Sequence, residues 1–487
     1  MTLNRKFIIR TISIILLSEG AAMIPALILA VAEKDASSVR SFAISAAAVI
    51  IAGLIGLNFT GRYRIKVKAR DSYFVVLVCW LTAIAAGVLP YLLSGQGYTP
   101  IDSIFESVAS WTTCSAWVID INHMPRSLLL WKATSSWLGG MGVILIAILI
   151  LSTLGVNAQK LMGAETPGPE LIKSTARMKD TAKATYGIYT LFSAAEYILL
   201  RLGGLPGFHA LINTMTTIST TGVQDYGNAV SLYFTPYVKV IIVIFSVISS
   251  LNFVIYLNLA RGRIREAVLE YEMKIFIAMI MLSGLFISGV LWFTQSGNTL
   301  FSSVVDAFAG TVSFSCTTGF TLERISSWPE ICKPILLVLM IIGGCANSTS
   351  GGIKVIRFAV FAKLIRRGMY KRIHPNAVSP VMLRDKPVSA LNVSSISCFV
   401  LLFFAVYLVS AIMLSLENLD METTLSAPVA LLTDTGVGFG KTADAAYTVF
   451  SQPGRLLCAL LMLMGRLELY AILILFSRSF WNSDRIH

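Results

Sequence analysis

The sequence predicts an all-α polytopic membrane protein in which four pseudo-repeated helix–pore-loop–helix units surround one pore. An extra N-terminal helical hairpin precedes them. Of the 487 residues, 55% are hydrophobic and only 13% are charged. Several apolar stretches reach the roughly 20 residues that a spanning helix needs. Four short polar loops interrupt this apolar sequence at intervals of about a hundred residues. Such a composition excludes an ordinary soluble domain.

The N-terminal hairpin, residues 1–71, is expected to consist of two apolar helices at 7–31 and 41–59. The first is too long for the apolar core of a signal peptide, so we expect it to be retained. Five Lys and Arg residues follow between positions 62 and 70. Because cytoplasmic links are enriched in Lys and Arg, we expect this link inside the cell.

Each of the four units should contain a spanning helix, a helix too short to span, a polar loop and a returning helix. The expected units are 72–183, 184–273, 274–387 and 388–487. Their expected helices are, in chain order, 72–93, 101–111, 127–154, 184–202, 208–218, 237–259, 275–294, 302–314, a run from 334, a run from 353, 388–416, 424–432 and 455–476. Basic clusters lie in the links that this scheme puts inside, so the net charge of +13 indicates membrane topology and not nucleic-acid binding.

The four polar loops, at 112–116, 219–223, 316–320 and 433–438, predict a cation filter. Non-helical backbone is tolerated at membrane depth only where it is buried in protein or lines water. A ring of such loops offers backbone carbonyls in place of the hydration shell of a cation. The predicted filter residues are Thr112, Thr113, Cys114, Ser115, Thr220, Thr221, Gly222, Thr317, Thr318, Gly319, Asp434, Thr435 and Gly436.

One position of the predicted filter departs from the others. Aligning the loops places Ser115 where the other three have Gly222, Gly319 and Gly436. Glycine turns successive carbonyls inward and leaves the lumen open. The Ser115 hydroxyl either enters the ion path or turns away from it, and the sequence leaves both open. If it enters, we expect weaker discrimination against sodium.

A second polar interruption, at 343–352, predicts a gate beneath the filter. Its candidate residues are Gly343, Gly344, Asn347, Ser348, Thr349, Ser350, Gly351 and Gly352. Such backbone must face water or protein; the alternative is a tight helix crossing through small residues. Arg466 lies inside the last apolar run, where an arginine is a functional candidate. We expect a pore-facing positive barrier near the gate; the alternative is an arginine that snorkels or caps carbonyls.

Enzymatic and metal-binding motifs are not supported. The triplet Asp434-Thr435-Gly436 matches an aspartic-protease motif, but that chemistry needs two carboxylates that share a proton. Residues 436–442 resemble a phosphate loop, but Thr435 stands where the spacing requires Gly. The seven cysteines and four histidines show no metal-ligand spacing. We therefore expect no enzyme and no bound cofactor, with a monovalent cation as the substrate.

The chain resembles the Trk/Ktr/HKT superfamily of potassium transporters, most closely its bacterial TrkH branch. The matching motifs are Phe105-Glu106-Ser107-Val108, Trp137-Leu138-Gly139-Gly140-Met141-Gly142, Ser348-Thr349-Ser350-Gly351-Gly352-Ile353-Lys354, His374-Pro375 and Gly465-Arg466-Leu467-Glu468. The resemblance extends from about Trp80 to the C-terminus, and the extra N-terminal helices are also typical of TrkH.

The resemblance implies potassium uptake across the bacterial inner membrane by a homodimer. It implies that residues 343–352 form the gating loop and that Arg466 is the pore arginine. It also implies a cytoplasmic, TrkA-like nucleotide-binding ring on the basic inner face. The family usually reads Thr-Thr-Thr-Gly in the first loop, and Ser at the position of Ser115 accompanies sodium transport in the plant HKT branch.

Three alternatives remain beside this hypothesis. The same fold could carry sodium as well as potassium because of Ser115. The protein could be a carrier with alternating access, but such carriers are built from two inverted halves, and the four similar units argue against this alternative. An intramembrane hydrolase would need a nucleophile paired with a base or a metal, and the sequence offers no such pair.

Overall fold

The computed structural model describes most of the chain as helices. The described residues are 5–60, 69–142, 175–222, 234–294, 299–320, 325–377, 379–383 and 386–473. The basic links at 62–68 and 160–174, the expected helical residues 143–154 and the loop residue Val223 lie outside these ranges.

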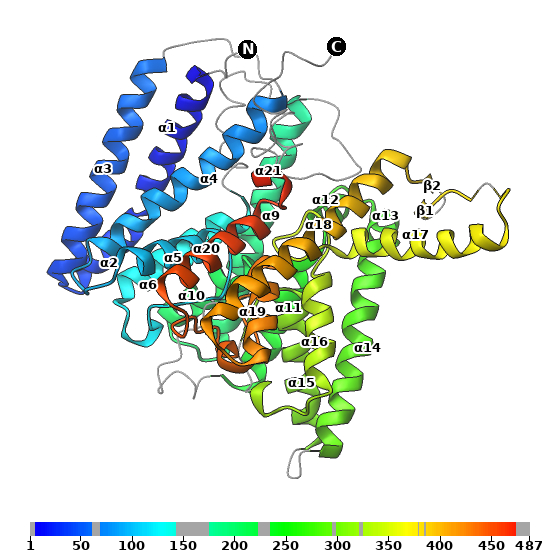
Figure 1. The fold of residues 1–487 in the computed structure, drawn as a ribbon. Helices are drawn as coiled ribbons and strands as arrows, with labels where there is room; N and C mark the ends of the chain where they lie inside the picture. The colour runs from blue at the N-terminus through cyan, green and yellow to red at the C-terminus, as the bar shows by residue number, and fades with distance from the viewer. Residues whose placement is uncertain are drawn as a thin grey trace.

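The N-terminal hairpin is present, and both of its expected spans are found. Helices α1 (Arg5–Ala22) and α3 (Ala36–Thr60) pack side by side (Figure 1). Gly53 permits their close contact, because a methyl group there would lie 2.8 Å from the Leu17 side chain. The expected helix at 7–31 is confirmed as one span over residues 5–32, in which only the turn residue Met23 separates α1 from α2 (Ile24–Ala32), just before Pro25.

Four short helices occupy the positions expected for pore helices. They are α5 (Pro100–Trp111), α10 (Gly207–Ile218), α15 (Leu300–Ser315) and α19 (Met421–Leu432). Three begin at a side-chain cap, in which Thr99, Thr299 or Asp420 accepts a hydrogen bond from a backbone N–H of the first turn. Each ends directly at one of the four polar loops, as the sequence predicts.

Further helices lie around these four (Figure 1). In chain order they are α4 (Ala69–Leu92), α6 (Arg126–Gly140), α9 (Thr175–Leu202), α11 (Pro236–Ser250), α12 (Phe253–Ala260), α14 (Tyr271–Thr294), α16 (Cys332–Ile342), α17 (Val355–Ile373), α18 (Ala390–Leu414) and α20 (Gln452–Arg466). The short helices α13 (Ile264–Val268) and α21 (Tyr470–Leu473), and a two-stranded hairpin of β1 (Met382–Leu383) and β2 (Lys386–Pro387), complete the described secondary structure, apart from single 3₁₀ turns.

Three returning helices differ from the prediction. The expected helix at 127–154 ends at Gly140, and Gly142 has a φ of 76°. The expected helix at 237–259 is a pair, α11 and α12, bent by 88°. Leu251 is extended there and the Asn252 side chain caps Val254 N. The expected helix at 455–476 ends at Arg466, where Glu468 and Leu469 take positive φ angles; residues beyond 473 lie outside the described part. The breaks after Ser250 and after Arg466 both lie beside residues 343–352.

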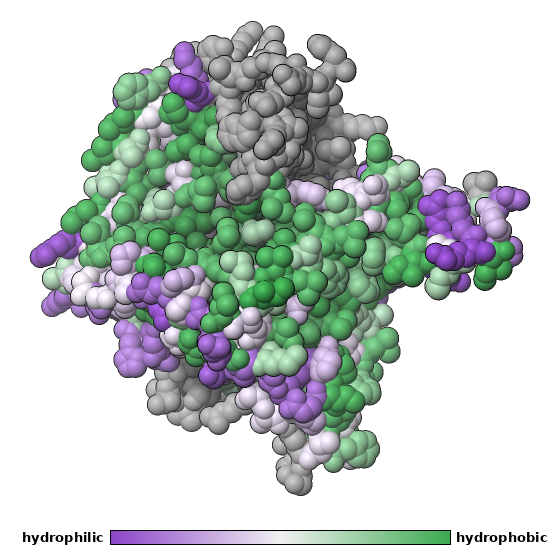
Figure 2. Space-filling view, viewed as in Figure 1, coloured by the Kyte–Doolittle hydropathy of each residue, from purple (hydrophilic) through white to green (hydrophobic). Residues whose placement is uncertain are grey.

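The surface is consistent with a membrane protein. Five described helices are long and apolar enough to span a membrane, and the bent pair α11–α12 would be a sixth. Large apolar side chains on these helices are exposed, including Phe293 on α14 at 80% and Ile412 on α18 at 69%. Figure 2 shows an apolar band across the molecule, with hydrophilic residues gathered below it and at the projecting end of α17. Exposed apolar surface of this extent marks a membrane-facing protein.

Candidate functional site

The four polar loops share one backbone conformation. In each, the residue after the helix cap has a positive φ: 61° at Thr113, 58° at Thr220, 52° at Thr317 and 55° at Asp434. This conformation is uncommon for residues other than glycine. Its fourfold recurrence after a short helix supports the sequence alignment of the loops. All thirteen predicted filter residues are buried.

The loops also meet in space. A methyl group on Gly222 would overlap the Thr318 carbonyl, and one on Gly319 would overlap the Thr435 carbonyl. One on Gly436 would lie 2.7 Å from the backbone N of Ser115. The second loop therefore contacts the third, the third the fourth, and the fourth the first. Glycine is required at these three positions by close approach and by φ angles of 65°, 64° and 78°.

The first loop follows a different path at its last position. Gly222, Gly319 and Gly436 each have a backbone N–H that donates to a carbonyl in the last turn of the preceding short helix. Ser115 has no positive φ and, among the described hydrogen bonds, makes no equivalent bond to the Ala109 carbonyl. Its hydroxyl instead donates to the Thr435 carbonyl at 2.6 Å. The Ser115 side chain thus points toward the fourth loop.

The arrangement of charges and dipoles suits a cation. The loops follow the C-terminal ends of α5, α10, α15 and α19, and these ends carry partial negative charge. The fourth loop adds Asp434, a buried side chain whose Oδ1 accepts no hydrogen bond from the described residues. Loop carbonyls and the Ser115 hydroxyl therefore meet in one buried region, while the Asp434 side chain lies beside Gly351 and Gly465.

Residues 343–352 form a non-helical loop between α16 and α17, as expected. Its ends cross closely, with Ile353 N bonded to Ile341 O at 3.0 Å and Val355 N to Gly344 O at 3.0 Å. A methyl group on Gly343 would lie 2.8 Å from Cα of Gly352. The paired glycines therefore permit the two ends of this loop to cross.

This loop contacts the polar loops directly. Gly351 N donates to the Thr317 hydroxyl at 2.7 Å, and a methyl group on Gly351 would overlap the Thr433 carbonyl. The segment between α11 and α12 contacts the first half of residues 343–352. Cys345 N bonds to Ser250 O at 3.0 Å, and Phe253 N bonds to Asn347 O at 3.1 Å. The polar Ser249-Ser250-Leu251-Asn252 stretch within an apolar run is the sequence signal for this support.

Arg466 joins residues 343–352 to the end of α6. Its guanidinium donates to the carbonyls of Thr349 at 3.1 Å, Gly139 at 2.5 Å and Gly140 at 2.9 Å. The geometry therefore matches the carbonyl-capping alternative, with Arg466 against residues 343–352. Glu468 pairs with Arg357 of α17 at 2.5 Å.

Glu272 is a further residue that the sequence analysis missed. One carboxylate oxygen of this buried side chain accepts Ala346 N at 2.8 Å and Ile356 N at 3.0 Å, at opposite ends of the loop. The expected helix at 275–294 begins earlier, at Tyr271, so Glu272 had been assigned to a link.

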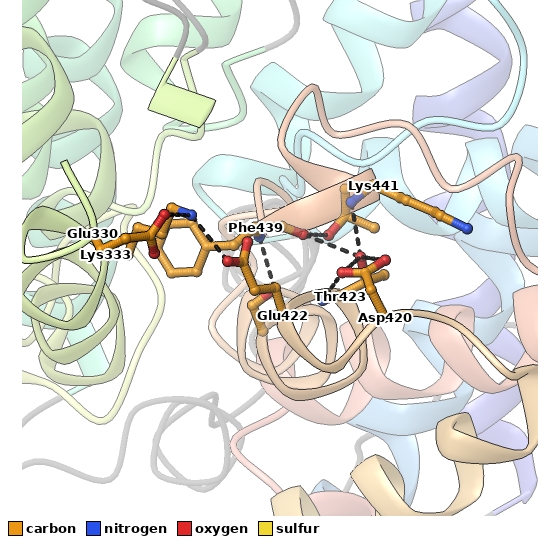
Figure 3. A network of polar contacts seen from close by, with 9 residues as sticks. Glu330, Lys333, Asp420, Glu422, Thr423, Phe439 and Lys441 are labelled. Carbon is orange, nitrogen blue, oxygen red and sulfur yellow. Dashed lines mark hydrogen bonds and ion pairs between the residues drawn. The ribbon is translucent and has the colours of Figure 1, made fainter. Parts of the chain in front are cut away.

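A polar network secures the segment after the fourth loop (Figure 3). The Thr423 hydroxyl accepts Lys441 N at 2.8 Å, while Asp420 caps Thr423 N at 2.9 Å. Nearby, Lys333 bridges Glu330 at 2.8 Å and Glu422 at 3.0 Å. These contacts fasten residues 439–442 to the start of α19 and connect α19 to α16.

Comparisons with known proteins place the chain in a transport family. The family model TrkH, described as a cation transport protein, matches residues 38–485. The Trk system potassium uptake protein TrkH of Salmonella typhimurium strain LT2 is 30% identical over 473 residues, which cover 96% of this chain and 97% of the relative. That of Escherichia coli K12 is 31% identical over 421 residues, covering 86% and 87%.

A solved structure agrees with these relatives. The crystal structure of the potassium transporter TrkH from Vibrio parahaemolyticus matches with a TM-score of 0.87 and 27% identity, covering 98% of this chain and 100% of that one. The relatives are ion-transport proteins and not enzymes. The chain is therefore a member of the TrkH family of cation transport proteins.

Proposed function

We propose that this protein takes up potassium across the bacterial inner membrane through a gated, channel-like pore. The observation that carries the proposal is the meeting of four loops with one repeated backbone at the C-terminal ends of four short helices. Loop carbonyls replace the hydration shell of the ion, and the helix ends favour its positive charge. The relatives named as potassium uptake proteins support this choice of ion.

The thirteen buried loop residues form the selectivity filter in this proposal. Three of its four loops have glycine at the aligned position, and the first loop has Ser115 there. Because the Ser115 hydroxyl is bonded to the Thr435 carbonyl, one carbonyl is shared between the ion and a protein donor. This observation favours a second candidate function, a pore of the same fold that also passes sodium.

Residues 343–352 and Arg466 form the gate in this proposal. The loop contacts the filter at Thr317 and Thr433, so an ion that leaves the filter meets it next. Arg466 adds a fixed positive charge and anchors the loop to α6. Opening requires Thr349 to separate from Arg466, or both to move together.

The assembly is also part of the proposal. We place the basic links in the cytoplasm, divide the chain into the hairpin and four pore units of the sequence analysis, and expect a homodimer. A TrkA-like nucleotide-binding ring would dock on the inner face and control the gate. An alternating-access carrier is less favoured, because four similar loops meeting at one point resemble a channel more than two inverted halves.

Ion flux in proteoliposomes that contain the purified chain tests the proposal. Potassium and sodium gradients are applied separately, and uptake is followed with a dye for each ion. We expect potassium-dominated flux, or a small flux that rises when residues 343–352 are shortened. No flux of either ion in both forms would contradict the pore hypothesis. Comparable potassium and sodium fluxes would favour the second candidate.

A further inference from the structure

A fully buried ion pair lies behind the first loop. Lys132 Nζ of α6 is 2.5 Å from Glu106 Oε2 of α5, and both side chains have an exposed fraction of 0%. Removing two charges from water is costly, so such a pair persists only where further hydrogen bonds satisfy it. Neither residue belongs to the proposed filter or gate.

The second carboxylate oxygen of Glu106 holds the backbone that follows the first loop. Glu106 Oε1 accepts Val118 N at 2.8 Å and Ile119 N at 2.9 Å. Hydrogen bonds to an ionised acceptor are stronger than neutral ones. The chain is therefore fixed three and four residues beyond Ser115.

The other three loops have no charged residue at the position that corresponds to Glu106. Counting six residues back from each helix cap gives Asn213, Gly310 and Ala427 as the counterparts of Glu106. In the fourth loop, Phe439 N occupies the position of Val118 N and bonds to the neutral Ser426 hydroxyl at 2.7 Å. A neutral acceptor is thus sufficient there.

The first loop has a particular need for this support. Among the described hydrogen bonds it makes no counterpart of the glycine N–H bond that ties each other loop back to its helix. The residues after the loop are held by other contacts. The backbone of Trp117 bonds to Ala445 and Tyr447. Val118 N and Ile119 N bond to Glu106. Cys114 N still bonds to Ala109 O at 2.9 Å, so the position of Ser115 depends on that bond and on contacts beyond the loop.

We propose that Glu106 is a positioning residue for ion discrimination, and that Lys132 balances its buried charge. Together they fix the backbone at Val118 and Ile119, and the loss of the acceptor lets the first loop shift relative to the other three, which weakens discrimination against sodium. This inference rests on the proposed filter function.

Two double variants separate the acceptor from the charge. Glu106→Gln with Lys132→Met removes both charges but keeps an oxygen for Val118 N and Ile119 N. Glu106→Leu with Lys132→Met removes the oxygen too. The control, Lys333→Met with Glu422→Gln, removes the ion pair between α16 and α19. Potassium and sodium fluxes are measured in proteoliposomes of the full chain for each protein.

We expect the potassium-to-sodium flux ratio to fall by about fivefold in the acceptor-free variant, the factor that corresponds to about 1 kcal/mol. The acceptor-keeping variant and the control should retain the parent ratio. In a Ser115→Gly background the fall should shrink, because glycine can restore the bond to Ala109. If the acceptor-free variant does not fold, Glu106→Asp, which keeps the charge but withdraws the oxygen, should lower the ratio.

An unchanged ratio in a folded, conducting acceptor-free variant, or in Glu106→Asp if that variant has to replace it, would overturn the inference. A ratio that falls equally in the acceptor-keeping variant would also overturn it, because charge and not positioning would then be responsible. Absence of cation flux in the parent itself would instead count against the proposed function, so the two failures are distinguishable.

Discussion

Replacing Ser115 with glycine should increase the preference of the protein for potassium. The substitution removes the 2.6 Å hydrogen bond from the hydroxyl to the Thr435 carbonyl. It also allows the first loop to adopt the positive φ of the other three and to bond back to Ala109. The first loop would then match its neighbours, and four equivalent carbonyl positions would face the ion.

The expected magnitude follows from the lost contact. A buried hydrogen bond between neutral groups contributes about 1 kcal/mol net, which corresponds to about a fivefold change in an equilibrium. We therefore expect the potassium-to-sodium flux ratio to rise by about fivefold in Ser115→Gly. Proteoliposome flux under matched potassium and sodium gradients measures this ratio.

A second variant separates the effect of the lost hydroxyl from the effect of the freed backbone conformation. Ser115→Ala removes the same hydrogen bond but still disfavours a positive φ. A smaller rise in Ser115→Ala than in Ser115→Gly would show that both effects contribute. Equal ratios in the native protein and in both variants, at similar total flux, would refute the reasoning.

The remaining predictions concern the gate. Gly343→Ala combines a strained φ with a 2.8 Å approach to Gly352, so thermal unfolding of the purified protein should show a loss of about 1–3 kcal/mol; an unchanged melting temperature would contradict this. Glu272→Ala leaves Ala346 N and Ile356 N without their acceptor and should raise potassium leak in proteoliposomes without a partner, whereas Glu272→Gln should leak less. Arg466→Gln removes the positive charge and weakens the anchor, so it should also raise partner-free flux; a flux below that of the native chain would count against a barrier role.

Local sequence was sufficient to locate the loops. Clusters of Thr, Ser and Gly within apolar runs identify backbone that cannot face lipid, so residues 112–116, 316–320 and 343–352 could be found without a structure. Caps such as Thr99 and Asp420 likewise mark where short helices begin. These features depend on neighbouring residues alone.

Other features depend on contacts between distant segments. The helix break at Leu251 is stabilised by a hydrogen bond from Phe253 N to Asn347 O, a carbonyl 94 positions away by residue number. The end of α20 at Arg466 likewise accompanies bonds to Gly139 and Gly140. Both breaks fall in short polar stretches, residues 249–252 and 465–468, but the contacts with distant carbonyls decide that the helices end there.

Polar contacts inside the protein could not be predicted from the local sequence either. Glu106 occurs within a recognisable motif, but its partner Lys132 lies on another helix. Glu272 was assigned to a link because its helix begins earlier than hydropathy indicates. Such side chains can be assigned roles only when the tertiary contacts are known.

The measurement that tests the account most directly is potassium flux through the native chain and through Gly319→Ala in proteoliposomes. A methyl group at Gly319 would overlap the Thr435 carbonyl and would occupy a backbone with φ of 64°. The account predicts potassium flux in the native chain, if necessary after residues 343–352 are shortened, and at least a tenfold loss in Gly319→Ala, which about 1.4 kcal/mol would produce. Equal flux in both proteins, or none in the native chain with either form of the loop, would contradict it.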